Sequence, residues 1–168
     1  MLFRSDASGA GSGKQVVDAM RTWSNSPVSH LVYTHGHADH IGGSGAFIAD
    51  AAARGMKRPT VVGHENVLAR MQRYEDTSDW NVLINRRQFG GIKSEMRAPM
   101  NAMHDPTHFL PPDTAKPDQT FDDRLDLRLG DRAVQLHHAR GETDDHLWAW
   151  VPEKKWMFTG DFVIWNFP

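Results

Sequence analysis

Histidine and aspartate side chains gather in one short stretch of the sequence. His35, His37, Asp39 and His40 lie within six positions, directly after a β-branched and aromatic run at residues 29–34. A loop that follows a strand can point several side chains at one place, whereas a continuing strand would alternate them between its faces. Imidazole and carboxylate groups together suit zinc, or another first-row metal such as manganese or iron. The spacing predicts a metal site. Four potential ligands within six positions disfavour the alternative, in which these are solvated loop histidines.

Composition narrows the class of protein. The 168-residue chain has no cysteine, which excludes a disulfide framework, a thiolate zinc site and a cysteine nucleophile. Its formal net charge of -2 shows no excess of basic residues of the kind that binds nucleic acid or an anionic membrane. No run reaches the ~18 apolar residues of a membrane span, and the Gly/Ser-rich start does not resemble a signal peptide. We expect one globular domain that acts on a small molecule. If the natural N-terminus is similar to the one given, we expect a cytoplasmic protein.

The elements that must position the histidine cluster alternate between strands and helices. Short β-branched and aromatic runs predict strands at residues 2–5, 29–34 and 60–63. Ala-rich or helix-periodic stretches predict helices at residues 42–54 and 64–73. An earlier helix is predicted from a capping box of Ser12 and Gln15, followed at helical spacing by Val16, Val17, Met20 and Trp23. Such alternation predicts an α/β fold.

The pattern changes in the second half of the chain. Residues 75–117 are rich in proline and predict a lid-like insertion over the surface, with a short helix near residues 80–89. Alternating apolar residues between 125 and 138 then predict a hairpin. A second hairpin is predicted from residues 146–151 and 156–159, with its turn at residues 152–155.

Three segments resemble those of the metallo-β-lactamase superfamily. Thr34-His35-Gly36-His37-Ala38-Asp39-His40 resembles the family's His-x-His-x-Asp-His signature. Gly141-Glu142-Thr143-Asp144-Asp145-His146 is similar to its Gly-x-Thr-x-x-His segment, and Thr159-Gly160-Asp161 to its Thr-Gly-Asp segment. These segments follow the family's order, and the resemblance covers about residues 6–162.

The resemblance implies a fold and a dinuclear metal centre. The fold would be an αββα sandwich, mainly its N-terminal half, in a single domain over residues 1–168 whose two ends are cut. Two divalent ions would bind, most simply Zn²⁺, with Mn²⁺ or Fe²⁺ as alternatives. The family's further histidine on the second ion lies beyond the residues given. The implied ligands are His35, His37 and His146 for the first ion, Asp39 and His40 for the second, and Asp161 as the bridge.

The resemblance also implies hydrolysis. A zinc-activated hydroxide would attack an ester-type bond, with Asp39 as the catalytic group that orients it and shuttles a proton. The context of residues 141–148 and 160–162 is similar to the alkylsulfatase-like branch, which implies an alkyl sulfate substrate. Alkylsulfatases carry a glutamate-rich ligand set in this region, where this chain offers His146 and Asp161. A lactonase, a thioesterase and a β-lactamase would use the same site, and a non-catalytic metal-binding fragment is the alternative from another class.

Other polar and aromatic residues have two interpretations each. Glu142, Asp144 or Asp145 would accept a hydrogen bond from a metal-bound histidine, or form a solvated acidic turn. Five other histidines are either contacts near the site or packing and surface residues: His64, His104, His108, His137 and His138. Of the last two, at most one can face inward. Four tryptophans would line a substrate pocket or belong to the core, with Trp165 the best pocket candidate because it follows Asp161; the others are Trp148, Trp150 and Trp156.

Overall fold

Two four-stranded β-sheets form the centre of the protein. The computed structural model describes residues 2–7, 9, 11–88 and 108–162. The first sheet is parallel, in the order β1 (Leu2–Ser5), β2 (Val28–Val32), β3 (Thr60–His64) and β4 (Gln119–Phe121). The second is antiparallel, in the order β5 (Arg124–Leu129), β6 (Arg132–His138), β7 (Leu147–Val151) and β8 (Trp156–Phe158).

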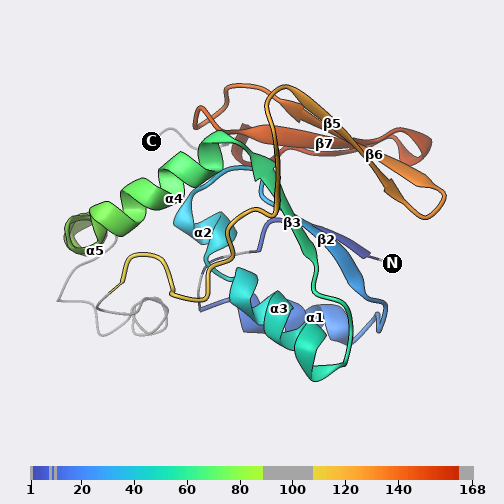
Figure 1. Cartoon of the computed structure of the whole chain (residues 1–168), viewed down its shortest axis with the longest axis horizontal. Helices are drawn as coiled ribbons and strands as arrows, with labels where there is room; N and C mark the ends of the chain where they lie inside the picture. The colour runs from blue at the N-terminus through green and yellow to red at the C-terminus, as the bar shows by residue number, and fades with distance from the viewer. Residues whose placement is uncertain (1, 8, 10, 89–107, 163–168) are drawn as a thin grey trace.

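Helices cover the parallel sheet on the side away from the antiparallel sheet (Figure 1). The α-helices of the described residues are α1 (Gly13–Arg21), α2 (Ala38–Ile41), α3 (Ser44–Ala53), α4 (Asn66–Asp76) and α5 (Ser78–Gln88). Helix α5 lies at the outer end of α4, away from the strands (Figure 1). Helices α1 and α3 lie beneath the parallel strands, and the antiparallel hairpins lie above them (Figure 1). The layers therefore run helix, sheet, sheet. None of the described helices has the length and apolar character needed to cross a membrane.

Alternate residues of the parallel strands supply two separate cores. Leu31 and Val61 pack with the helices, whereas Val32 and Val62 pack against the antiparallel sheet. All four are 0% exposed, as expected for parallel strands that are covered on both faces. Because β2 and β3 are neighbouring parallel strands, the polar residues that follow them lie at the same edge of the sheet.

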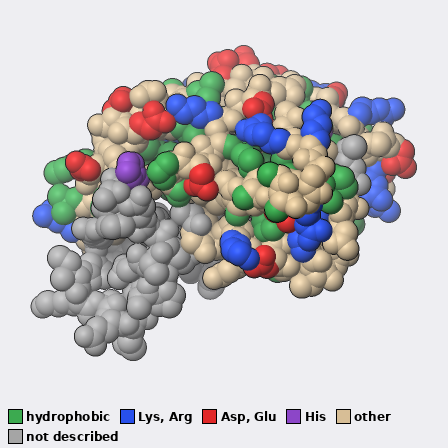
Figure 2. All heavy atoms as spheres, turned by 60° about the horizontal axis from the view of Figure 1, so that its bottom comes forward, with side chains coloured by type: hydrophobic (Ala, Val, Ile, Leu, Met, Phe, Trp, Pro, Cys, Tyr) green, Lys and Arg blue, Asp and Glu red, His purple; other side chains and the backbone are tan. Residues whose placement is uncertain are grey.

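Acidic and basic side chains are interspersed on the surface that Figure 2 shows. Neither sign gathers into a continuous patch on this face. This distribution matches the small formal net charge of the sequence, -2.

The structure confirms the predicted alternation and both hairpins, and it corrects local details. The capping box is wrong: Ser12 has helical backbone angles, and its hydroxyl donates to the Gly9 carbonyl (3.2 Å) instead of capping α1. Trp23 lies beyond the end of α1 and is 70% exposed, so it does not belong to the buried face. Strand β4 was missed because only three residues pair, and α2 because its single turn lies within the histidine cluster.

The described residues of the predicted insertion after position 107 contribute to the core. Helix α5 lies where the short helix was expected. Phe109 and Ala115 are buried, and the Tyr33 hydroxyl donates to the Ala115 carbonyl (2.8 Å). The part of the segment from 108 onward is therefore anchored to the fold and does not only run over the surface. The lid itself stays a prediction, since residues 89–107 lie outside the described residues.

A largely buried ion pair joins α1 to α3, and we expect it to stabilise the packing of these two helices. Arg21 donates from Nε and Nη2 to one oxygen of Asp50 (3.0 and 2.5 Å), with side chains only 8% and 14% exposed. The change Asp50→Asn leaves the guanidinium without a full countercharge and should lower the free energy of unfolding by about 3–5 kcal/mol. Chemical denaturation at neutral pH measures this loss.

The matched control and the pH dependence follow from the same pair. Asp18→Asn breaks the exposed Lys14–Asp18 pair (80% and 61% exposed) and should change the free energy of unfolding by less than about 1 kcal/mol. Burial raises the pKa of Asp50, but hydrogen bonds from Arg21 and Arg54 lower it below its ordinary value overall. The stabilisation is therefore present above the ordinary carboxyl pKa and is lost as the pH falls through the lowered one. Equal losses from the two variants would contradict this account.

Candidate metal centre

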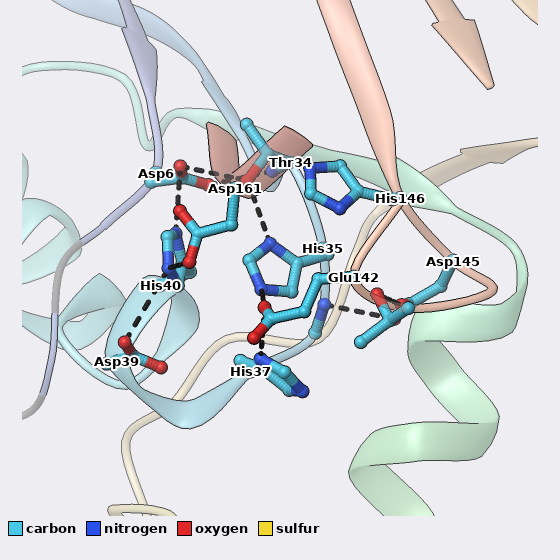
Figure 3. A network of polar contacts seen from close by, with 12 residues as sticks. Asp6, Thr34, His35, His37, Asp39, His40, Glu142, Asp145, His146 and Asp161 are labelled. Carbon is cyan, nitrogen blue, oxygen red and sulfur yellow. Dashed lines mark hydrogen bonds and ion pairs between the residues drawn. The ribbon is translucent and has the colours of Figure 1, made fainter. Parts of the chain in front are cut away.

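The histidine cluster begins at the carboxyl end of β2 and continues into α2. Thr34 and His35 lie two and three residues beyond the end of the strand and are 0% exposed. His37 then takes an extended conformation at the start of α2 (φ -68°, ψ 145°), and the helical turn carries Asp39 and His40. The cluster is thus part loop and part helix, which directs side chains from neighbouring positions toward a common space (Figure 3).

Two histidines of this cluster meet a glutamate from another loop. The Glu142 carboxylate oxygen Oε2 lies 2.9 Å from His37 Nδ1 and 3.2 Å from His35 Nε2 (Figure 3). One ligand atom from each of the three residues can lie within 4.8 Å of the others, which is close enough to hold a metal ion. We call His35, His37 and Glu142 the first ligand group.

A second group shares His35 with the first. His40 Nε2 lies 3.3 Å from an Asp161 carboxylate oxygen, and His35, His40 and Asp161 also place ligand atoms within 4.8 Å of one another. We call these three residues the second ligand group. Asp39 lies beside it, 3.6 Å from His40 Nε2, with its side chain 78% exposed. The structure therefore brings five of the six predicted ligands into or next to two adjoining groups.

His146 lies beside these groups without joining either. Its ring stacks on that of His35 (centroids 4.6 Å apart, 13° between planes). The His146 Nε2 lies 3.2 Å from the Thr159 carbonyl, and Nδ1 is buried with no hydrogen-bond partner. Glu142, considered earlier only as a hydrogen-bond acceptor, occupies the place beside His35 and His37 that the resemblance gave to His146. Metal binding by His146 stays a prediction.

Asp6 is a residue of this cluster that sequence reasoning missed. It follows β1, and its carboxylate accepts hydrogen bonds from the Thr34 amide (2.7 Å), the Thr34 hydroxyl (2.9 Å) and His40 Nδ1 (3.1 Å). This contact orients the His40 ring so that Nε2 faces Asp161. The available signal was an acidic residue at the end of a neighbouring parallel strand, since such ends meet at one edge of the sheet.

The protonation of the histidines follows from their surroundings. Burial, together with the nearby His40 and His37 rings, lowers the pKa of His35 to about 2, so this imidazole is neutral at pH 7. Burial also lowers the pKa of His40, but the hydrogen bond and charge of Asp6 outweigh it and raise the pKa to about 9. Binding of a metal ion through His40 Nε2 would therefore release a proton from that nitrogen.

The donor set fits a divalent cation. His35 Nε2 is buried and, although close to Glu142, makes no hydrogen bond with it. A buried ring nitrogen without such a bond is costly, and a cation between imidazole and carboxylate groups would satisfy it. Nitrogen and oxygen ligands at this spacing suit zinc and its first-row neighbours.

Comparison with known proteins assigns the chain to a family. The family model of the metallo-β-lactamase superfamily matches residues 10–164. The chain belongs to the metallo-β-lactamase superfamily. It is 24% identical over 157 residues to the linear primary-alkylsulfatase of Pseudomonas sp. (strain ATCC 19151), a match that covers 88% of this chain and 28% of the alkylsulfatase.

Solved structures show the same fold. A Cronobacter sakazakii metallo-β-lactamase with an HARLDQ motif superimposes with a TM-score of 0.62 at 15% identity, covering 99% of this chain and 54% of that one. A double mutant of the sec-alkyl sulfatase PisA1 gives 0.64 at 14% identity, covering 94% of this chain and 26% of that one. The chain spans about half or less of the length of these relatives. The α/β class and the metallo-β-lactamase fold expected from the sequence are confirmed.

Three of the other candidate histidines of this metallo-β-lactamase domain, His64, His137 and His138, have ring-stacking contacts. His64 ends β3, accepts a hydrogen bond from the Asn66 amide (3.1 Å) and stacks on His138, which favours the packing interpretation. His138 faces inward, and His137 stacks on Trp148. His108 is exposed, and His104 lies outside the described residues.

The tryptophans of the domain fit neither interpretation fully. Trp148 and Trp150 are half-buried, and Trp156 is 54% exposed, so none of the three belongs to the core. Along β7, Trp148 and Trp150 alternate with Leu147, Ala149 and Val151, which take the inward positions. Trp165 lies outside the described residues, and its contact with substrate stays a prediction.

Proposed function

We propose that this domain is a zinc-dependent hydrolase that cleaves an ester-type bond, with an alkyl sulfate as the first substrate class to test. The superfamily is one of hydrolases, which supports enzymatic activity. The observation that carries the proposal is the pair of ligand groups that share His35. Such a pair suits two neighbouring ions, the arrangement that stabilises both the attacking and the leaving group in hydrolysis.

The proposed ligand assignment follows the geometry. His35, His37 and Glu142 would hold one ion, and His40, Asp161 and the nearby Asp39 the other. His146 is the alternative third ligand of the first ion, as the resemblance implies. The presence of Glu142 in the first ligand group supports the alkylsulfatase branch, whose resemblance implied glutamate ligands in this region.

The chain's own residues have distinct parts in this proposal. When bound, the metal ions supply a Lewis acid and lower the pKa of a coordinated water. Asp6 holds the His40 ring in place from behind. The exposed Asp39 carboxylate is positioned to accept a proton from the attacking water and to pass it on. Glu142 joins the loop before β7 to the histidines after β2.

A substrate panel tests the proposal against its alternatives. The zinc-loaded chain is incubated with a medium-chain alkyl sulfate, a lactone, a thioester and a β-lactam, and sulfate release or ring and ester hydrolysis is measured. Sulfate release supports the proposed substrate class. Turnover of only another compound keeps the hydrolase and replaces the substrate class. One bound zinc equivalent without any turnover supports the non-catalytic metal-binding alternative and contradicts the proposal.

Asp39→Ala should lower the turnover number by about 10²–10⁴-fold, the usual contribution of a positioned general acid–base group. Because Asp39 is exposed and lies outside both ligand groups, the variant should retain the ion held by the first of them. The measurement is the rate at saturating substrate, with bound metal determined on the same sample. Asp18→Ala, a change of an exposed helical aspartate, is the control. Near-wild-type turnover by Asp39→Ala would refute the assignment.

A further inference from the structure

Asp145 is a fully buried carboxylate that the proposed chemistry does not use. Its side chain is 0% exposed and accepts hydrogen bonds from the Gly36 amide (2.9 Å), from Arg70 Nε (3.0 Å) and from the Thr143 hydroxyl. The Arg70 side chain, from α4, is only 11% exposed and supplies the countercharge. A buried charge with a paired cation and this many donors is held in one place.

These hydrogen bonds join the two loops that carry the first ligand group. Gly36 separates the two histidines of that group, and Thr143 directly follows Glu142. The histidine loop follows β2 of the parallel sheet, whereas the loop of residues 141–146 precedes β7 of the antiparallel sheet. Asp145 therefore holds the main chain of one sheet's loop against the other's, as Figure 3 shows for its contact with the histidine loop.

The packing around this contact leaves no space for a side chain at residue 36. A Cβ atom on Gly36 would lie 2.7 Å from an Asp145 carboxylate oxygen and 2.8 Å from Arg70 Cδ. The neighbouring Asp144 also pairs with Arg70 (2.6 Å), but its side chain is 65% exposed and points its carboxylate at the arginine rather than at the loops. The two adjacent aspartates thus share a partner and differ in whether they reach the histidine loop.

We propose that Asp145, held by Arg70, is a positioning residue that sets the separation of the histidine loop and the Glu142 loop and thereby the metal affinity of the first ligand group. The inference rests on the proposed function, because it takes that group to bind a metal ion. Metal ligands must be held to within about 0.5 Å by the contacts that support them. Asp145 supplies this support to both sides of the group at once.

The test compares Asp145→Asn with the matched control Asp144→Asn in the full chain. Co²⁺ is the probe, because its absorption spectrum reports ligand geometry and its titration gives the affinity. Asp145→Asn should weaken Co²⁺ binding by about 10–100-fold, the usual cost of losing a residue that supports the ligands, and should shift the spectrum. Asp144→Asn should stay within about fivefold, as for an exposed ion pair. Wild-type affinity and spectrum in Asp145→Asn, or equal losses in both variants, would overturn the proposal.

A second comparison decides the matter if Asp145→Asn does not fold. Thr143→Val removes the hydroxyl that donates to Asp145, and Thr143→Ser retains it. In the metal-free protein, the amide NMR signal of Gly36 should move in Thr143→Val and stay in Thr143→Ser, because the two loops are coupled through Asp145. An unmoved Gly36 signal in Thr143→Val would overturn the proposal. If the wild-type chain binds no Co²⁺, the proposed function fails, and this comparison still tests the coupling of the loops.

Discussion

His35→Asn should weaken metal binding at the first ligand group about 100-fold and abolish hydrolysis. His35 is the residue that the two groups share, and its ring is neutral and buried at their junction. Roughly 10–16 kcal/mol of zinc binding shared among four ligands gives about 3 kcal/mol for each, or a loss of about 100-fold in affinity. Zinc titration and turnover measured on the same preparation test this.

The control for this variant is another histidine away from the ligand groups. His137→Asn changes a half-buried ring that stacks on Trp148 and should leave zinc affinity unchanged. Thermal unfolding of the metal-free proteins shows whether His35→Asn keeps its fold. A folded His35→Asn chain that still binds zinc as tightly as the wild type would exclude His35 as a ligand of the first ion.

Glu142→Gln should weaken zinc binding at the first ligand group about 100-fold, while His146→Asn should weaken it much less. Glu142 lies within 3.2 Å of both histidines of that group, whereas His146 Nε2 lies 3.2 Å from the carbonyl of Thr159. Glutamine keeps the size of the side chain and removes its charge, so the comparison isolates the ligand role. Competition between each variant and a coloured chelator measures the affinities.

The same comparison has a clear opposite outcome. If His146→Asn loses zinc and Glu142→Gln does not, the third ligand is the histidine that the resemblance implies. Glu153→Gln is the control for loss of an acidic side chain, because Glu153 accepts a hydrogen bond from the Ala133 amide in a surface turn. It should leave zinc binding unchanged.

The sequence was enough to place the histidine cluster. The ligand types at residues 35–40 are contiguous and follow a strand, so local pattern alone brings them to the edge of the sheet. The hairpins could also be predicted from the sequence, because apolar residues alternate along β5, β6 and β7 and occupy the buried inward positions. Local periodicity predicts structure that is determined by residues close in the sequence, and the histidine cluster and the hairpins are mostly of this kind.

The remaining parts of the site depend on contacts between distant residues. Glu142 and His146 occupy one short segment, and spacing does not tell which of them faces the histidines. Asp145 of that segment is hydrogen-bonded to Arg70, which lies 75 positions earlier in the chain. Asp6 is a lone acidic residue in the sequence, and its role appears only when β1 pairs beside β2 and brings it to His40.

The most direct test of the central claim is a calorimetric titration of the metal-free chain with Zn²⁺. We predict two binding events for each chain, corresponding to the two ligand groups that share His35. Protons should be released on binding, because Asp6 stabilises the charged form of His40 through Nδ1 and the ring must lose the proton on Nε2 to bind an ion. Absence of zinc binding above background would contradict the account, since it would show that these residues form a hydrogen-bonded cluster and not a metal centre.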